Sequence, residues 1–423
     1  MRLLVNGIFK RFRIRTAPGG TLRTAIGVAM HRFFQRSVFV LSLGLLVVLL
    51  GGEFGLRAVR AGSNDDGAYK QINVYQQVLK KIQTDYVTDP NIGNVTNGAL
   101  HGLLESLDSD SSYMNAKEYE AYKQHPAGAG AQVGLDISKR FGYAVIVDVT
   151  PGSPADKEHL ATGDAIESVD GQSTRELSLA MLRVMLEGKP GSQVTLSVLR
   201  PRKPDPEKLT LSRTVPAQPP LHEEQYENAS ILYLKPSVLT SARVDEVASQ
   251  LKNAGKKKVL LDLRNVGEGD PQQGLRLANF FLKQGTMATL SGQKFPTQTF
   301  TADSAKCLSD APLAVLVNRG TAGAAELAAA ALADNKRADL VGERTFGEGS
   351  VQKTIELPDG GALVLTIAFY TAPGGKKILE DAVTPGVQVG PPQDQDDEDD
   401  DAAPAKGDPA LDKALDVLKT KTA

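Results

Sequence analysis

Residues 320–352 read GTAGAAELAAAALADNKRADLVGERTFGEGSVQ. The apolar run 314–317, shortly before them, predicts a buried strand. A loop of small residues then leads into an alanine-rich helix over 326–333, because alanine is the strongest helix former and its small side chain allows close packing. The first amides of that helix would point at the loop that bears Gly323, an arrangement that suits a developing oxyanion.

The stretch resembles the active-site region of the carboxyl-terminal processing peptidases, S41 serine peptidases also called tail-specific proteases. That family has a Ser nucleophile in a segment of the type Gly-Thr-Ala-Ser-Ala-Ser-Glu and a Lys general base in a later Gly-Lys-Gly turn. The resemblance puts the nucleophile position at Gly323 and the base position at Glu348. It also implies that Gln352 is a retained orienting residue and that Gly269 and Ala324 hold the oxyanion-hole positions.

Neither of the two reactive positions carries the chemistry of hydrolysis. Acyl transfer needs an oxygen or sulfur nucleophile and a neighbour that takes its proton, but Gly323 has no side chain and Glu348 differs from Lys in length and charge. A third departure lies in 261–269, where LDLRNVGEG replaces the family's Leu-Asp-Leu-Arg-Asn-Asn-Pro-Gly-Gly. Glu268 there would oppose the charge of a tetrahedral intermediate. The sequence therefore predicts a catalytically inactive pseudo-protease.

No other group of side chains replaces the lost ones. Four of the five histidines precede the core and the fifth, His222, lies at its start, and the chain has no His-Glu-x-x-His or Cys-x-x-Cys motif, so we expect no metal and no cofactor. Ser350 and Thr321 lie near the pocket in sequence, but neither has a base beside it. Two alternatives stay open: an active serine-type endopeptidase with an unrecognised nucleophile, and a non-enzymatic envelope scaffold.

Residues 131–215 change to short β-rich runs, 143–149 and 194–199, with a helix near 177–186. Pro154 is suited to the first turn of a short helix, and Asp170-Gly171 to a hairpin turn. The phrase PGSPADKEHLATGDAIESVDGQ, residues 151–172, resembles a PDZ domain.

A PDZ domain binds a peptide C-terminus as an added strand, with loop amides around the terminal carboxylate. The resemblance implies peptide binding by Val133, Gly134, Leu135, Asp136 and Ile137. Gln132 stands where the family usually has Gly, which would tighten or block entry of the carboxylate. The expected partners are therefore protein or peptide C-termini. As an alternative, a PDZ fold can serve only as a lid or spacer.

The remaining segments complete a predicted α+β multidomain fold. Residues 69–125 form a helical region with apolar residues at three and four spacing, and 221–390 form the α/β peptidase-like core. Residues 391–407 form an acidic linker. A C-terminal helix over 408–421, with Asp408 as N-cap and Pro409 in the first turn, is expected to dock on the core.

The N-terminus predicts a membrane segment. Residues 1–36 form a basic arm with eight Lys or Arg and no acid, and the mainly apolar segment 37–56 follows. This pattern favours an uncleaved single-pass anchor in the cytoplasmic membrane, with the bulk of the chain in the periplasm or outside. A signal peptide cleaved after Ala61 and a buried core helix are the alternatives.

Whole-chain composition is that of a globular protein. The 423 residues are 41% hydrophobic and 23% charged, with a net charge of −2, so we expect no nucleic-acid partner. The single cysteine, Cys307, excludes an internal disulfide. The sequence leaves the oligomeric state open.

Overall fold

A computed structural model describes residues 65–124, 130–140, 142–200, 203, 205–215, 219–379, 381–390 and 407–421. The predicted basic arm, the membrane segment 37–56, Ala61 and all but the last residue of the acidic linker lie outside the described residues. In the described part of the chain, no helix is both long and apolar enough to cross a membrane. The chain divides into two units, 1–92 and 93–423.

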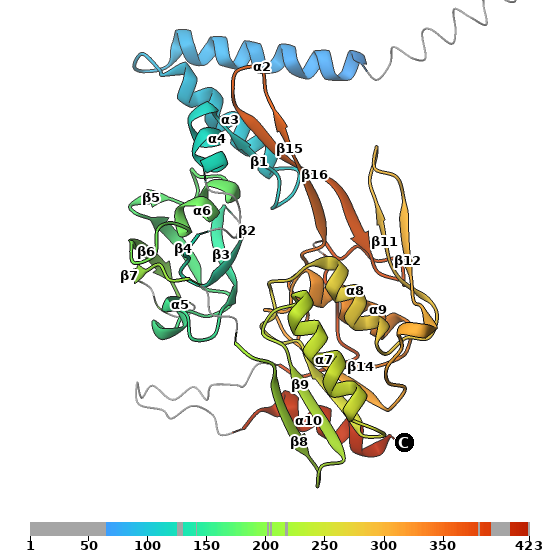
Figure 1. Ribbon diagram of the computed structural model, residues 1–423. Coiled ribbons are helices and arrows are strands. Elements are labelled where there is room, and N and C mark those ends of the chain that lie inside the picture. The colour runs from blue at the N-terminus through green and yellow to red at the C-terminus, as the bar shows by residue number, and fades with distance from the viewer. Residues whose placement is uncertain are drawn as a thin grey trace, which may run out of the picture. The chain divides into compact units, whose positions relative to one another are not determined.

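The N-terminal unit contains helix α2 (Asp65–Asp85), drawn in blue in Figure 1. A helix is predicted here from the spacing of Val74, Val78 and Ile82. The helix is present, but Val74 and Val78 remain 49% and 52% exposed. The periodicity thus predicts the element correctly without indicating a buried face.

The second unit opens with α3 (Ile92–Glu105), β1 (Ser112–Met114) and α4 (Ala116–Gln124). A purely helical region over 69–125 is wrong at β1, which pairs antiparallel with β16 (Ala362–Thr371). The Asp108 carboxylate accepts hydrogen bonds from the amides of Asp110 and Ser111, forming a turn that leads the chain into the sheet. All three residues of β1 are buried, which stabilises the strand.

Residues 130–215 form a five-strand path in the order β2-β3-β4-β6-β7, with β5 beside β4. The elements are β2 (Leu135–Arg140), β3 (Tyr143–Val149), α5 (Pro154–Lys157), β4 (Ala165–Val169), β5 (Gln172–Ser173), α6 (Leu179–Leu186), β6 (Gln193–Leu199) and β7 (Glu207–Ser212). Because β2 lies at the edge of the sheet, its outer side is not paired with another strand of that sheet.

Local signals in this segment are confirmed. Pro154 lies in the first turn of α5, and the Ser153 side chain caps the helix by accepting from the Asp156 amide. Asp170 and Gly171 have φ values of 47° and 78° and join β4 to β5 in the two-residue turn that a hairpin favours.

The α/β core is built on a second sheet, in the order β17-β14-β13-β10-β9-β8. Its strands are β8 (His222–Tyr226), β9 (Ile231–Lys235), β10 (Lys258–Asp262), β13 (Leu313–Val317), β14 (Asp339–Gly342) and β17 (Val387–Gln388). The pairs from β9 to β17 are parallel, and β8 is antiparallel. Helices cover both faces, so β13 is buried along its whole length.

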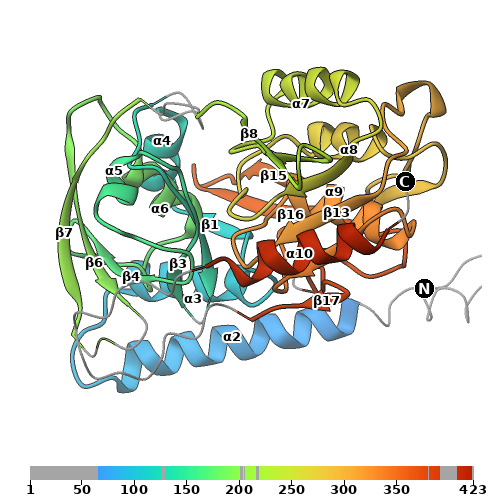
Figure 2. The same ribbon diagram turned by 90° about the horizontal axis from the view of Figure 1, so that it is seen from below.

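Three helices pack on one face of this sheet, and one packs on the other. The first face carries α7 (Ser241–Asn253), α8 (Pro271–Asn279) and α9 (Ala324–Asp334). The opposite face carries α10 (Pro409–Thr420), whose Ala414, Leu415 and Leu418 contact alternate residues of β9, β10 and β13. Figure 2 shows α10 in red on the side of β13 away from α7.

A third sheet joins β1 and β16 to β11 (Thr286–Ser291) and β12 (Gln298–Thr301), with β15 (Ser350–Glu356) beside β16. A short 3-10 helix, η1 (Ser304–Lys306), follows β12.

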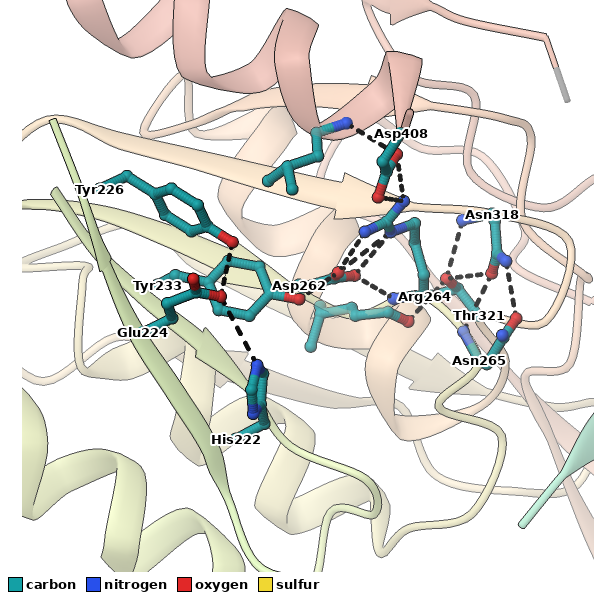
Figure 3. Close-up of polar contacts among 12 residues, drawn as sticks. His222, Glu224, Tyr226, Tyr233, Asp262, Arg264, Asn265, Asn318, Thr321 and Asp408 are labelled. Atoms are coloured by element: carbon teal, nitrogen blue, oxygen red, sulfur yellow. Dashed lines mark hydrogen bonds and ion pairs between the residues drawn. The ribbon is translucent and has the colours of Figure 1, made fainter. Parts of the chain in front are cut away.

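A polar network holds α10 to the core (Figure 3). Asp408 is the N-cap of α10, as predicted, and accepts from the Leu411 amide. Its carboxylate also pairs with Arg264 at 2.7 Å, and Arg264 pairs with the fully buried Asp262 at 2.6 Å. The Tyr233 hydroxyl donates to the same Asp262 carboxylate at 2.8 Å.

Candidate functional site

Gly323 lies where β13 passes into α9, the strand-to-helix turn on which nucleophiles of other hydrolase folds are presented. Its φ of 54° and ψ of −115° are values that residues with a side chain rarely adopt. A Cβ built on Gly323 would lie 4.0 Å from Glu348 Oε2 and 3.7 Å from the Gly267 carbonyl oxygen. The predicted nucleophile and base positions therefore face each other.

Glu326 links the two loops that carry these positions. Its carboxylate accepts from the amides of Gly323 at 3.2 Å, Gly347 at 2.8 Å and Glu348 at 2.7 Å, and from the Thr345 hydroxyl. Glu326 is fully buried, and burial raises its pKa to about 7 despite these donors. This single side chain therefore positions Glu348 opposite Gly323.

The surroundings of Glu348 favour its protonated form. Burial and the neighbouring Asp136 carboxyl raise the pKa of Glu348 to about 8, although Arg183 acts in the opposite direction. Arg183 Nη2 lies 3.9 Å from Glu348 Oε1 and 4.0 Å from Asp136 Oδ1. A carboxyl group with a pKa near 8 is mostly protonated at pH 7, so only a small fraction of it is in the form that accepts a proton.

The two oxyanion-hole positions are side by side. A Cβ on Gly269 would lie 3.1 Å from the Ala324 Cβ, and Ala324 is the first residue of α9. Glu268, next to Gly269, accepts a hydrogen bond from the Gln132 side chain. Partial burial and Asp136 raise the pKa of Glu268.

Asp148, on strand β3, contacts the loop residue that precedes Glu268. Its Oδ2 accepts from the Gly267 amide at 3.2 Å. Asp148 and Asp136 are cross-strand partners on β3 and β2, and both would contact a Cβ on Gly267. Two carboxyl groups therefore enclose one side of this loop.

The remaining polar candidates are Gln352, Ser350 and Thr321, and their hydrogen bonds go to residues other than Gly323 and Glu348. Gln352 Nε2 donates to Asp110 Oδ2 at 3.3 Å and contacts Ser350, and the Ser350 hydroxyl donates to the same Asp110 oxygen at 2.5 Å. Thr321 is fully buried, and its hydroxyl donates to the Leu263 carbonyl at 2.8 Å. The expectation that neither hydroxyl has a base beside it therefore fails at Ser350, whose partner is the Asp110 carboxylate, whereas Thr321 donates to a backbone carbonyl.

A groove runs between β2 and α6. Leu135, Asp136 and Ile137 from β2 line a cavity of about 1030 Å³ together with residues of α6. Val133 is fully buried in the sheet's own core, and Gly134 has a φ of 84°, with no room for a Cβ beside Ser153. Arg183 of α6 donates across the groove to the Ile137 carbonyl at 3.3 Å.

Comparison with known proteins matches two segments of the chain to family models. Residues 131–212 match the PDZ domain, and 230–389 match peptidase family S41. The carboxyl-terminal-processing protease of a Picosynechococcus species is 32% identical over 305 residues, 69% of this chain and 73% of that protein. The chain belongs to the S41 family of carboxyl-terminal processing proteases.

Other members of the family extend the match. The carboxy-terminal-processing protease of Bartonella bacilliformis is 29% identical over 78% of this chain and 77% of its own length. The solved structure of a photosystem II D1 C-terminal processing protease superimposes with a TM-score of 0.62 at 28% identity, covering 74% of this chain and 86% of that one.

Four of the five residues carried over from the S41 pattern meet in one place: Gly323, Glu348, Gly269 and Ala324. The fifth, Gln352, contacts Asp110 and Ser350. Sequence reasoning did not find the positioning role of Glu326, which sits three residues after Gly323 as a capping-box glutamate would. That spacing is a signal for its contact with the Gly323 amide.

Asp148 and Arg183 also escaped sequence reasoning. Asp148 contacts Gly267, which lies 119 residues later in the chain. Arg183 lies on α6 of the PDZ segment and contacts Glu348 of the core. No local pattern predicts either contact.

Proposed function

We propose that this chain is a catalytically inactive member of the S41 family that binds the C-terminal tails of proteins without cutting them. The observation that carries the proposal is the pair Gly323 and Glu348. The turn has the geometry of a nucleophile site, but the side chain is missing and its neighbour is a carboxyl group with a pKa of about 8. Hydrolysis by the family's mechanism requires a nucleophile and an unprotonated base.

Tail binding is supported by the edge position of β2, which pairs with no further strand of its sheet and whose Ile137 carbonyl accepts from the Arg183 side chain. A peptide can add to this edge as a further strand, with its side chains alternating between the groove and the opposite side. The five predicted binding residues, 133–137, form the loop and the first half of this edge. The relatives from Bartonella bacilliformis and Picosynechococcus are carboxyl-terminal-processing proteases by name.

The test uses the full-length chain in mild detergent and a labelled peptide with either a free or an amidated C-terminus. We expect binding to the free acid to be tighter by roughly tenfold or more, because amidation removes a charge-assisted hydrogen-bond acceptor. Mass spectrometry should recover the free-acid peptide intact. Equal binding of both forms would refute the groove, and no binding with a stable partner complex would favour a scaffold.

We also propose that the chain is anchored in the cytoplasmic membrane by 37–56, with the rest outside. The support is the one-sided charge: eight basic residues precede the apolar segment and no acidic residue does. A reporter that fluoresces only in the cytoplasm, fused after Ala423, should stay dark. The same reporter fused to a chain that begins at Gly62 should fluoresce, and a bright full-length fusion would refute the anchor.

A further inference from the structure

The cavity beside β2 has a strongly acidic lining. It extends from the β2 and α6 groove to the core residues Val238, Leu239 and Gly269. Among the described residues that line it, six are acidic and one, Arg183, is basic. The acidic residues are Asp110, Asp136, Asp148, Glu187, Glu268 and Asp270. The lining would carry a large negative charge if all of these groups were ionised.

One of these carboxyl groups has an unused oxygen inside the protein. Asp148 is only 4% exposed, and its Oδ2 accepts from the Gly267 amide. Its Oδ1 is buried and has no hydrogen-bond partner within the described part of the chain. A buried acceptor without a partner costs about 1–3 kcal/mol, so a donor supplied by a ligand would be favourable here.

The basic residue of the cavity does not fill this need. Arg183 is shared among Asp136, Glu348 and the Ile137 carbonyl. The pKa of Asp148 is raised to about 7, mainly by burial and to a smaller extent by the nearby Asp136 and Glu268 carboxyl groups. The cavity is therefore short of positive charge, and an added cation would let more of its carboxyl groups ionise.

We propose that the cavity binds a lysine or arginine side chain of a protein tail held along β2. This inference rests on the proposed tail binding and adds a preference for sequence. Leu135 and Ile137 are buried in the PDZ core, whereas Asp136 between them faces the core loop, where a Cβ built on Gly267 would lie 3.2 Å from Asp136 Oδ2. In a strand added beside β2, the side chains level with Asp136 point to this same side. The basic residue therefore belongs at alternate positions of the tail, including the penultimate one.

The test is a lysine scan by fluorescence anisotropy with the full-length chain. The parent peptide has alanine at its last four positions and a free C-terminus, and each position is changed in turn to lysine or glutamate. We expect lysine at the penultimate position to tighten binding by about tenfold, as one hydrogen bond between charged groups would. Glutamate there should weaken it, and lysine at the last position should have little effect.

Variants identify the groups responsible. Asp148→Asn and Asp136→Asn should lose the preference for lysine, and Asp136→Lys should prefer glutamate instead. The matched control is Glu176→Gln, which removes an exposed carboxylate from the same PDZ segment and should keep the preference. Thermal unfolding of each variant checks that it is folded. The reversed preference of Asp136→Lys cannot arise from misfolding.

The outcomes separate this inference from the proposed function. If the alanine peptide binds through its free carboxylate but lysine, alanine and glutamate give equal affinity, the inference is wrong and tail binding stands. If lysine helps equally at all four positions, the attraction is a general charge effect and the cavity is not a specific site. If no peptide binds, both are wrong.

Discussion

Gly323 and Glu348 decide the chemistry at the scale of single residues. The first provides no nucleophile, and burial raises the pKa of the second to about 8, which favours its protonated form at pH 7. The positive φ of Gly323 adds about 1–3 kcal/mol of strain for any other residue at this position, a cost that surrounding contacts must offset. Under the proposed inactivity, a serine at position 323 alone would still face Glu348 in place of the family's lysine.

We expect Gly323→Ser alone to cleave no tail-bearing substrate, because Glu348 holds its proton at neutral pH. Gly323→Ser with Glu348→Lys should recover a trace of cleavage, since the Ala324 amide remains in place to donate to an oxyanion. Recovery should stay poor while Glu268 lies beside Gly269. The measurement is single-turnover cleavage followed by mass spectrometry.

Gly323→Ala with Glu348→Lys is the matched control for that experiment. This variant restores the base without a nucleophile and should cleave no substrate. Cleavage by Gly323→Ser alone, at a rate equal to that of the double variant, would contradict the role given to Glu348.

The S41 resemblance assigned Gly323 and Glu348 to one site, and a Cβ built on Gly323 would lie 4.0 Å from Glu348 Oε2. Their roles remain predictions. The contact of Asp148 with the Gly267 amide depends on how two separate sheets meet. The spacing of residues along the chain does not indicate how the two sheets pack together, so the acidic cavity could not be predicted.

At the scale of elements, local signals predicted most of the fold. Tyr143–Val149 is a strand with the predicted limits, and Asp408 caps the predicted last helix. The exception is β1, whose three residues are a strand only because β16, some 250 residues later, pairs with them. A tertiary partner determined this element, and local propensity did not.

The attachment of α10 depends on Asp408. We expect Asp408→Ala to lower the free energy of unfolding by about 1–3 kcal/mol, because it removes both an N-cap and a partner of Arg264. The measurement is urea denaturation followed by circular dichroism. Asp412→Ala, an exposed acid in the same first turn, is the control and should change stability by less than about 0.5 kcal/mol. Equal effects of the two substitutions would contradict the anchoring role.

At the scale of the whole molecule, buried carboxyl groups predict the direction of the pH dependence of stability. Asp148 and Glu326 have pKa values of about 7 and Glu348 of about 8, all above their unfolded values near 4. Between pH 5 and pH 8 the folded chain therefore binds more protons than the unfolded chain. Stability must fall as the pH rises through this window, by up to about 1.4 kcal/mol per pH unit for each extra proton.

Urea denaturation at pH 5, 6, 7 and 8 measures this slope. Asp148→Asn should flatten it, because asparagine resembles the protonated acid and cannot release a proton. The control Glu176→Gln should leave the slope unchanged. A stability that is constant or rises from pH 5 to pH 8 would contradict the burial of these groups.

Cleavage of a tail-bearing substrate by the wild-type chain tests the central claim most directly. The assay compares the wild type with a Ser350→Ala, Thr321→Ala double variant and includes the carboxy-terminal-processing protease of Bartonella bacilliformis for reference. Loss of a nucleophile or base from a serine protease typically reduces turnover by roughly a million-fold, so we predict no product from the wild type above the uncatalysed rate. Robust cleavage by the wild type that the double variant abolishes would reveal a relocated nucleophile and contradict the account.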